Sequence, residues 1–255
     1  MESIKEISQK IENATREEFE SIKEVLKEDT RKGVIAAIKK KENKIIKLEK
    51  EIKEYKFRQR YEIDLFKKGY KYIAGLDEVG RGPLAGAVYA SAVILNPKSS
   101  YLGVKDSKKL SEKQREELDI KIRETALTYA IGIATPEEID KYNILNATKM
   151  AMIRAIEALT IKPDYLLLDA IKLDINIPQT SIIKGDDNSI SIGASSIIAK
   201  VARDSYMKEM GKQYPGYDFE SNKGYGASKH IEGIKLLGPT PIHRNTFIKN
   251  ILGEK

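Results

Sequence analysis

Two adjacent carboxylates, Asp77 and Glu78, follow a short apolar run and stand directly before a glycine-rich turn. The turn, residues 80–86, contains three glycines, an arginine and a proline. Carboxylate oxygens are the preferred ligands of hard divalent cations, and glycines let a backbone approach a phosphate closely. This arrangement suits a metal ion bound next to a phosphate. An acidic pair at a strand end can also be an ordinary solvated feature, so the rest of the chain has to decide.

Three predicted strands end on acidic residues. These acids are Asp77 with Glu78, Asp169, and Asp186 with Asp187. Ligands gather at the carboxyl ends of strands in open α/β sheets, so four carboxylates converge if these ends lie side by side. Two divalent ions would neutralise four carboxylates, as in two-metal phosphodiester chemistry. Because adjacent strand residues point to opposite faces, Asp77 and Glu78 can share a site only if their strand ends or twists between them.

The composition restricts the metal sites that the chain can build. There is no cysteine, and His230 and His243 are the two histidines, so thiolate and histidine-rich zinc sites are excluded. A carboxylate site points to magnesium or manganese. We expect both histidines in loops or at helix ends, and neither as a general base. The formal net charge of +7 favours a polyanionic partner such as nucleic acid.

The 255-residue chain shows no targeting or membrane-spanning pattern. Its N-terminus is charged and lacks the apolar segment of a signal peptide, and no apolar run is long enough to span a membrane. The absence of cysteine fits a reducing compartment. We therefore expect a cytoplasmic protein, acting as a monomer and without a membrane partner.

Residues 1–66 differ from the rest of the chain. They contain no proline, a single glycine at Gly33, and many lysines, glutamates and isoleucines. Apolar residues at helical spacing predict a helical N-terminal extension, with a second helix beginning near residue 30 and carrying an isoleucine every seven residues from Ile38. The basic stretch 31–60 either lies along nucleic-acid phosphates or forms part of a solvated helical hairpin.

From about residue 70 the pattern becomes α/β, which predicts one α/β domain over 70–255 with a helical C-terminal segment. The predicted strands are 71–76, 84–95 as one or two strands, 129–134, 164–169 and 181–183. The predicted helices run from Ser111 to about residue 128, from Thr135, over 146–159 and over 189–211, and shorter helices follow the later loops.

The sequence DEVGRGPLAG, from Asp77 to Gly86, resembles the signature of type 2 ribonucleases H, specifically bacterial ribonuclease HII. The resemblance covers about residues 70–248 and implies a ribonuclease H-like fold with a mixed central β-sheet flanked by helices. The N-terminal extension is similar to that of some Gram-positive members. Further blocks agree in order and spacing: 106–111, 168–169, 184–186, 199–204, 222–226 and 243–247.

The resemblance also implies roles for individual residues. The catalytic residues and ligands of two Mg²⁺ or Mn²⁺ ions would be Asp77, Glu78, Asp169 and Asp186. The turn Gly80-Arg81-Gly82 would contact the ribonucleotide mainly through its backbone, and Tyr225 would pack on the sugar and sense the 2′-hydroxyl, the group that distinguishes RNA from DNA. The remaining candidate substrate contacts are Ser107, Lys108, Lys184, Lys200, Arg203 and Lys223.

The implied activity is that of a metal-dependent endoribonuclease. It would hydrolyse the RNA strand of RNA/DNA duplexes and incise 5′ of single ribonucleotides embedded in duplex DNA, leaving 3′-hydroxyl and 5′-phosphate ends. Two alternatives are a ribonuclease HIII-like hybrid nuclease, whose N-terminal domain differs, and a non-catalytic duplex-binding protein. The short helical extension disfavours the first, and four carboxylates directed at phosphate disfavour the second. The sequence identifies no sliding-clamp or polymerase partner.

Overall fold

The computed structural model describes residues 2–253, which divide into two compact units. The first unit ends at Lys56 and the second begins at Phe57, earlier in the chain than the predicted end of the extension at residue 66. The division falls within helix α3 (Lys32–Arg58). Among the described residues, none of the helices combines the length and the apolar character of a membrane span.

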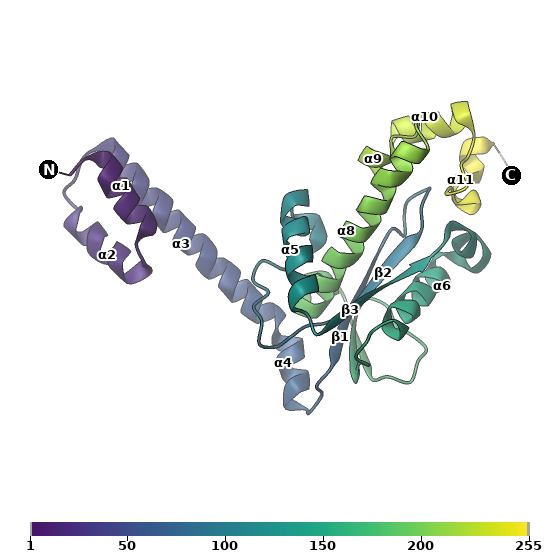
Figure 1. The fold of residues 1–255 in the computed structure, drawn as a ribbon, viewed down its shortest axis with the longest axis horizontal. Helices are drawn as coiled ribbons and strands as arrows, with labels where there is room; N and C mark the ends of the chain where they lie inside the picture. The colour runs from purple at the N-terminus through teal and green to yellow at the C-terminus, as the bar shows by residue number, and fades with distance from the viewer. Residues whose placement is uncertain (1, 254–255) are drawn as a thin grey trace. The chain divides into compact units, whose positions relative to one another are not determined.

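The first unit consists of α1 (Ile4–Asn13), α2 (Arg16–Val25) and most of α3 (Figure 1). Ser3 and Thr15 begin α1 and α2, each through a capping box with the glutamate three residues later. The sequence pattern did not separate α2 from its neighbours, although its capping residues were visible. Buried residues from all three helices form one small core: Ile7, Ile11, Ala14, Phe19 and Val34.

Within the described part of the second unit, five strands form one mixed sheet in the order β3-β2-β1-β4-β5. β1 is antiparallel to β2 and parallel to β4, which is in turn parallel to β5. The predicted mixed α/β sheet is therefore confirmed. The strands are β1 (Ile73–Val79), β2 (Val88–Ile94), β3 (Thr128–Ala134), β4 (Tyr165–Asp169) and β5 (Gln179–Ile182).

The predicted strand over 84–95 is too long at its start. Residues 84–87 form a loop, in which Ala85 makes an isolated bridge with His243. Gly86 has a φ of +87°, which interrupts the extended backbone before β2 begins at Val88. Apolar content alone could not separate this buried loop from a strand.

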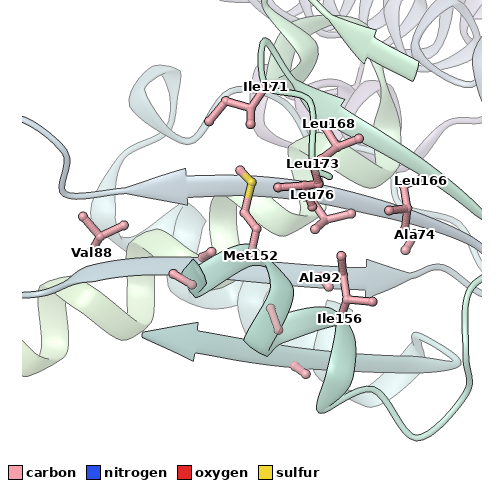
Figure 2. Packing of buried hydrophobic residues seen from close by; sticks show 14 of the residues in the cluster. Ala74, Leu76, Val88, Ala92, Met152, Ile156, Leu166, Leu168, Ile171 and Leu173 are labelled. Atoms are coloured by element: carbon pink, nitrogen blue, oxygen red, sulfur yellow. The ribbon is translucent and has the colours of Figure 1, made fainter. Parts of the chain in front are cut away.

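Two long helices cover opposite faces of the sheet, α6 (Pro136–Glu157) and α8 (Ile190–Gln213) (Figure 1). Met152 and Ile156 of α6 pack against Leu76 and Ala92 on one face (Figure 2). α6 bends at Asn143, whose φ is 67°, which explains why the sequence predicts one helix start at Thr135 and another at residue 146. The other helical segments are α4 (Arg60–Lys67), the 3-10 turn Ser107–Lys109, α5 (Glu112–Thr125), α7 (Gly185–Asn188), α9 (Phe219–Asn222), α10 (Ser228–Leu237) and α11 (Asn245–Leu252).

Helix α4 packs with the second unit, although its residues fall in the predicted extension. Leu65 joins a buried cluster with Ile192 at the start of α8. The buried carboxylate of Glu62 accepts hydrogen bonds from the Ser189 hydroxyl, the Ser191 amide and the Ser191 hydroxyl, at 2.5, 3.1 and 2.6 Å. These contacts attach α4 to the first turn of α8, the helix that lies behind β1.

Candidate active site

The central strands end at different levels, and this places three acids together. The ladder between β1 and β4 ends at the pair Leu76–Leu168, while β1 continues through Val79 along β2. Asp77 and Glu78 therefore flank the place where β4 stops, and Asp169 is the last residue of β4. β1 does not end between the two acids. The neighbouring strand ends instead, so side chains from both faces of β1 can approach this opening.

A short helix brings the fourth acid to the same place. Lys184 adopts a left-handed conformation with φ 54°, and α7 begins immediately after it. The Gly185 amide donates to Asp169 Oδ1 at 2.7 Å. A Cβ at Gly185 would lie 3.2 Å from Asp169 Cα and 2.7 Å from Ile192 Cδ1, so the glycine permits this close approach. Asp186, in the first turn of α7, is thereby held beside the end of β4.

The four acids interact electrostatically. Burial raises the pKa of Asp77 well above its usual range, and the charges of Glu78 and Asp169 raise it further. Burial also raises the pKa of Glu78, against the opposing effect of the nearby Arg81. The pKa of Asp186 rises to about 6, because the group is buried and because Asp106 and Asp169 lie near it. Either bound protons or a bound cation can relieve this repulsion.

The carboxylates do not yet surround a common point. Glu78 Oε1 accepts from Arg81 at 3.2 Å, and Asp186 Oδ1 accepts from the Asp187 amide at 3.0 Å. Among residues 2–253, no three acidic or histidine side chains are already arranged around one ion. Glu78 Oε2, however, is buried and has no hydrogen-bond partner in the described chain. An unpartnered carboxylate oxygen among mutually repelling acids fits a hard divalent cation.

Two buried arginines hold the loop that follows β1. Arg244 donates to the carbonyls of Gly80, Arg81 and Gly86. Arg203 donates to the carbonyls of Ala85, Ala87 and Lys223, at 3.2, 3.1 and 3.0 Å. Gly80 is required here, because it has a φ of +92° and a Cβ would lie 2.2 Å from Arg203 Nε. The turn after the two acids is thus fixed from its inner side.

The structure corrects the expectation for Arg203. Its side chain is fully buried, and its guanidinium is occupied by backbone carbonyls, so a role in phosphate contact is not supported. Ser107 is also buried, and its hydroxyl lies 2.9 Å from that of Ser196. Ser196 in turn hydrogen-bonds Asp77 and lowers its pKa. Ser107 is therefore connected to Asp77 through Ser196.

The other candidate contacts lie in different surroundings. Tyr225 is 45% exposed, and a Cβ placed on Gly82 would lie 3.8 Å from its ring, so the ring lies beside the turn. Lys108 Nζ is exposed and 3.9 Å from Asp186 Oδ2. Lys200 is paired with Asp204 at 2.8 Å. Lys184 is exposed at the start of α7, and the Lys223 ammonium donates to the carbonyl of Glu220.

Sequence reasoning missed four residues that shape the site. Asp106 raises the pKa of Asp186, and Arg244 holds the turn. Ser196 bonds Asp77, and His243 lies in the buried network described below. Asp106, His243 and Arg244 stand within blocks that carry the family resemblance, so that signal was available. Ser196 is one of several small residues on α8 and has no distinguishing pattern.

Comparison with known proteins agrees with this geometry. A family model described as "Ribonuclease HII" matches residues 74–250, and one described as "Ribonuclease HII N-terminal domain" matches residues 3–66. The chain belongs to the ribonuclease HII family. A ribonuclease HII of Geobacillus sp. (strain WCH70) is 48% identical over 256 residues, covering 99% of this chain and 92% of that protein. As a family member, the protein is a metal-dependent endonuclease of the ribonuclease H class that acts on RNA/DNA hybrids.

Solved structures share the fold of the catalytic unit. The crystal structure of ribonuclease H2 from Pyrococcus horikoshii OT3 matches with a TM-score of 0.62 and 27% identity, over 71% of this chain and 97% of that one. Bst-RNase HIII, crystallised in complex with Mn²⁺, matches with a TM-score of 0.56 and 19% identity, over 71% and 69%. The likeness to ribonuclease HIII is one of fold, whereas the two ribonuclease HII models account for both parts of this chain.

Proposed function

We propose that this ribonuclease HII incises the 5′ side of single ribonucleotides embedded in duplex DNA, leaving 3′-hydroxyl and 5′-phosphate ends. The proximity of the Tyr225 ring to Gly82, in the turn that directly follows Asp77 and Glu78, carries the proposal. A ring at this position can pack on one sugar and detect its 2′-hydroxyl while the acids face the adjacent phosphate. A single ribonucleotide then suffices for recognition.

Asp77, Glu78, Asp169 and Asp186 are proposed to hold two divalent ions, Mg²⁺ or Mn²⁺. All the donors are hard carboxylate oxygens, and the unpartnered Glu78 Oε2 supports their use as ligands. When bound, two such ions supply an activated nucleophile and stabilise the attacking and leaving oxygens of an in-line displacement.

The chain's own residues supply positioning and charge around that reaction. The turn Gly80-Arg81-Gly82 is fixed by Arg244 before substrate arrives, so its outward backbone groups can bind the ribonucleotide without first being ordered. Lys108, close to Asp186 and exposed, is the candidate best placed to contact a phosphate near the acids. Lys184, Lys200 and Lys223 are proposed as weaker phosphate contacts, with Lys200 requiring release from Asp204.

The catalytic domain is proposed to comprise residues 70–255 together with α4, and the extension to contribute to duplex binding. Lysines recur along α3, and the groove that it forms with α1 is lined by Lys40, Lys41 and Lys44. Basic residues repeated along one helix can follow a phosphate backbone. The proposed partners are RNA/DNA hybrids and DNA duplexes that contain ribonucleotides.

The test is cleavage of a labelled DNA duplex containing one ribonucleotide, measured in Mg²⁺ and in Mn²⁺. An all-DNA duplex and a long RNA/DNA hybrid serve as controls, and Asp77→Asn controls for contaminating nuclease. We expect one cut directly 5′ of the ribonucleotide and none in the all-DNA duplex. Cleavage of the long hybrid alone would contradict recognition of a single ribonucleotide.

A further inference from the structure

Two buried histidines connect the C-terminal segment to Tyr225. His230 lies in the first turn of α10 and His243 just before α11, and their Nε2 atoms are 3.0 Å apart. His230 Nδ1 lies 2.8 Å from the carbonyl oxygen of Tyr225. The Thr240 amide lies 2.8 Å from His243 Nδ1 and donates to it. One chain of hydrogen bonds therefore runs from Thr240 through both rings to Tyr225.

The two ends of this chain determine where each proton lies. The Tyr225 carbonyl can only accept, so His230 Nδ1 carries a hydrogen and His230 Nε2 keeps a lone pair. The Thr240 amide can only donate, so His243 Nδ1 keeps a lone pair and His243 Nε2 carries a hydrogen. His243 Nε2–H then donates to His230 Nε2. Each ring has one neutral tautomer that satisfies every bond.

The surroundings keep the pair neutral and immobile. Burial lowers the pKa of His243 to about 4, with a further contribution from His230, and burial also lowers the pKa of His230. Phe219 packs edge-on against His230, with ring centroids 5.0 Å apart, and Tyr217 packs against His243 at 5.2 Å. Both side chains are buried within the C-terminal segment, and within residues 2–253 their ring nitrogens bond only to each other, to Tyr225 and to Thr240.

The residue next to His243 holds the opposite side of the same site. Arg244 donates to the carbonyls of Gly80 and Arg81, while the histidine chain ends on the carbonyl of Tyr225. The ring of Tyr225 lies beside Gly82 of the turn. His243 and Arg244, adjacent in one segment, thus add two side-chain hydrogen-bond paths to the backbone bonds that join Gly224 to Leu84 and Ala85.

We propose that His230 and His243 are positioning residues for 2′-hydroxyl recognition, fixing the Tyr225 backbone so that its ring stays beside Gly82. The proposal rests on the recognition role given to Tyr225 above. A small displacement of a group that must pack on one sugar is costly, since a shift of about 1 Å near a reacting centre can reduce a rate roughly a hundredfold.

The experiment compares His230→Leu with His230→Asn in the full-length enzyme. Leucine removes the side-chain donor to the Tyr225 carbonyl and leaves the Ala227 amide as its donor, whereas asparagine keeps an N–H near the position of Nδ1. With Mg²⁺ and a duplex containing one ribonucleotide, we expect His230→Leu to lower kcat/KM roughly tenfold to a hundredfold and His230→Asn to retain most of it. The Kd for an all-DNA duplex should not change in either variant.

A double-mutant cycle with Tyr225→Ala separates positioning from general stability. If His230 acts through Tyr225, His230→Leu has no further effect once the ring is gone. Met152→Ala, buried beneath the other face of the sheet, is the control, because it should lower Tm without altering the ratio of ribonucleotide cleavage to duplex binding. If His230→Leu does not fold, His243→Gln, which keeps an N–H toward His230, enters the same cycle with a smaller expected loss.

The outcomes distinguish the two proposals. An unchanged rate for Tyr225→Ala would remove Tyr225 from recognition and overturn the proposed function at this residue. A strong effect of Tyr225→Ala, with the histidine substitution equally harmful in both backgrounds, would leave that function standing and overturn the positioning role. Loss of activity in His230→Asn equal to that in His230→Leu would also overturn it.

Discussion

The acidic side and the loop side of this active site satisfy their buried charges in opposite ways. Asp77 is buried and Glu78 is partly buried, both with raised pKa values, and Glu78 Oε2 lacks a hydrogen-bond partner among the described residues. Arg203 and Arg244 are fully buried, yet their guanidinium groups are taken up by the carbonyls of the loop 80–87 and of Lys223. The charges of the acidic side are thus satisfied only when a ligand binds. The arginines and carbonyls of the loop are already paired with one another before any ligand binds.

The difference follows from what each side must do. A cation site gains affinity from charges that repel one another in its absence, and this costs stability in the metal-free protein. A recognition turn gains more from being rigid, because binding then pays no ordering entropy. Substitutions on the acidic side should therefore alter chemistry while sparing stability, whereas those that release the loop should lower stability as well as recognition.

The largest effect is expected for Asp77→Asn. The substitution removes a charged ligand from a buried position in β1, beside the end of β4, so the turnover rate should fall about a thousandfold or more, equivalent to several kcal/mol of transition-state stabilisation. Duplex binding should be retained, because no phosphate contact is lost. Single-turnover cleavage and a binding titration measure the two effects, and a near-native rate in Mg²⁺ would contradict the assignment of Asp77 as a ligand.

The loop side is tested by Arg244→Met. It leaves the buried carbonyls of Gly80, Arg81 and Gly86 without donors, so the free energy of unfolding should fall by roughly 3 kcal/mol. Arg81→Met is the matched control, since Arg81 belongs to the same turn but is half-exposed and paired with Glu78. Its removal should cost less than about 1 kcal/mol. Equal losses in urea unfolding would remove the distinction between the two arginines.

On the acidic side, a substitution should raise the free energy of unfolding, whereas Arg244→Met lowers it. The pKa of Asp186 is raised from 3.8 to about 6 in the folded state. Between pH 3.8 and about 6 the folded protein therefore keeps a proton on Asp186 that the unfolded chain has released. Stability contributed by the protonated group is complete below pH ~4 and is lost as the pH rises through 6. Without metal at pH 7.5, Asp186→Asn should therefore stabilise the protein by roughly 1–3 kcal/mol.

The same comparison at other conditions sharpens this prediction. The gain from Asp186→Asn should nearly vanish at pH 4, where the wild-type carboxyl is protonated, and Mg²⁺ should reverse it at neutral pH by binding the wild-type site more tightly. Asp187→Asn is the control, because Asp187 is paired with Lys109 and should yield no gain. A destabilised Asp186→Asn variant in chelator would mean that the acidic side is already satisfied.

The sequence supports much of the fold because its signals are local. Ser111 and Thr135 cap α5 and α6 as predicted, with Pro136 in the first turn, and β3 and β4 lie within a residue of their predicted positions. The loop 84–87 was mistaken for strand because both are buried and apolar. The loop differs from a strand in the positive φ of Gly86. A glycine permits this conformation, but its presence in the sequence does not predict it.

The site divides in the same way. Acids at strand ends can be read from the chain, because topology brings those ends together. The burial of Arg203 could not be predicted from the sequence. Its partners are the carbonyls of Ala85 and Ala87, which are distant in sequence, and any residue type can supply a backbone carbonyl. The histidine pair was hidden for a similar reason: His230 and His243 match no catalytic spacing, and their bond exists only once α10 and α11 are packed.

The smallest effect is expected for removal of the N-terminal extension. This truncation should change only the affinity for the duplex, unlike substitutions at the acids or in the loop. Removal of residues 1–56 should raise Kd for the duplex a few-fold and flatten the dependence of log Kd on log salt, while kcat is preserved, because the lysines of the extension are proposed to neutralise phosphates and the proposed metal ligands all lie in the second unit. Removal of residues 1–66 also deletes α4 and leaves Ser189 and Ser191 without Glu62, so that truncation should lower Tm as well. An identical salt slope in the 1–56 truncation would show that the extension does not contact nucleic acid. A loss of kcat there, with Tm unchanged, would show that it helps to arrange the acids or the loop.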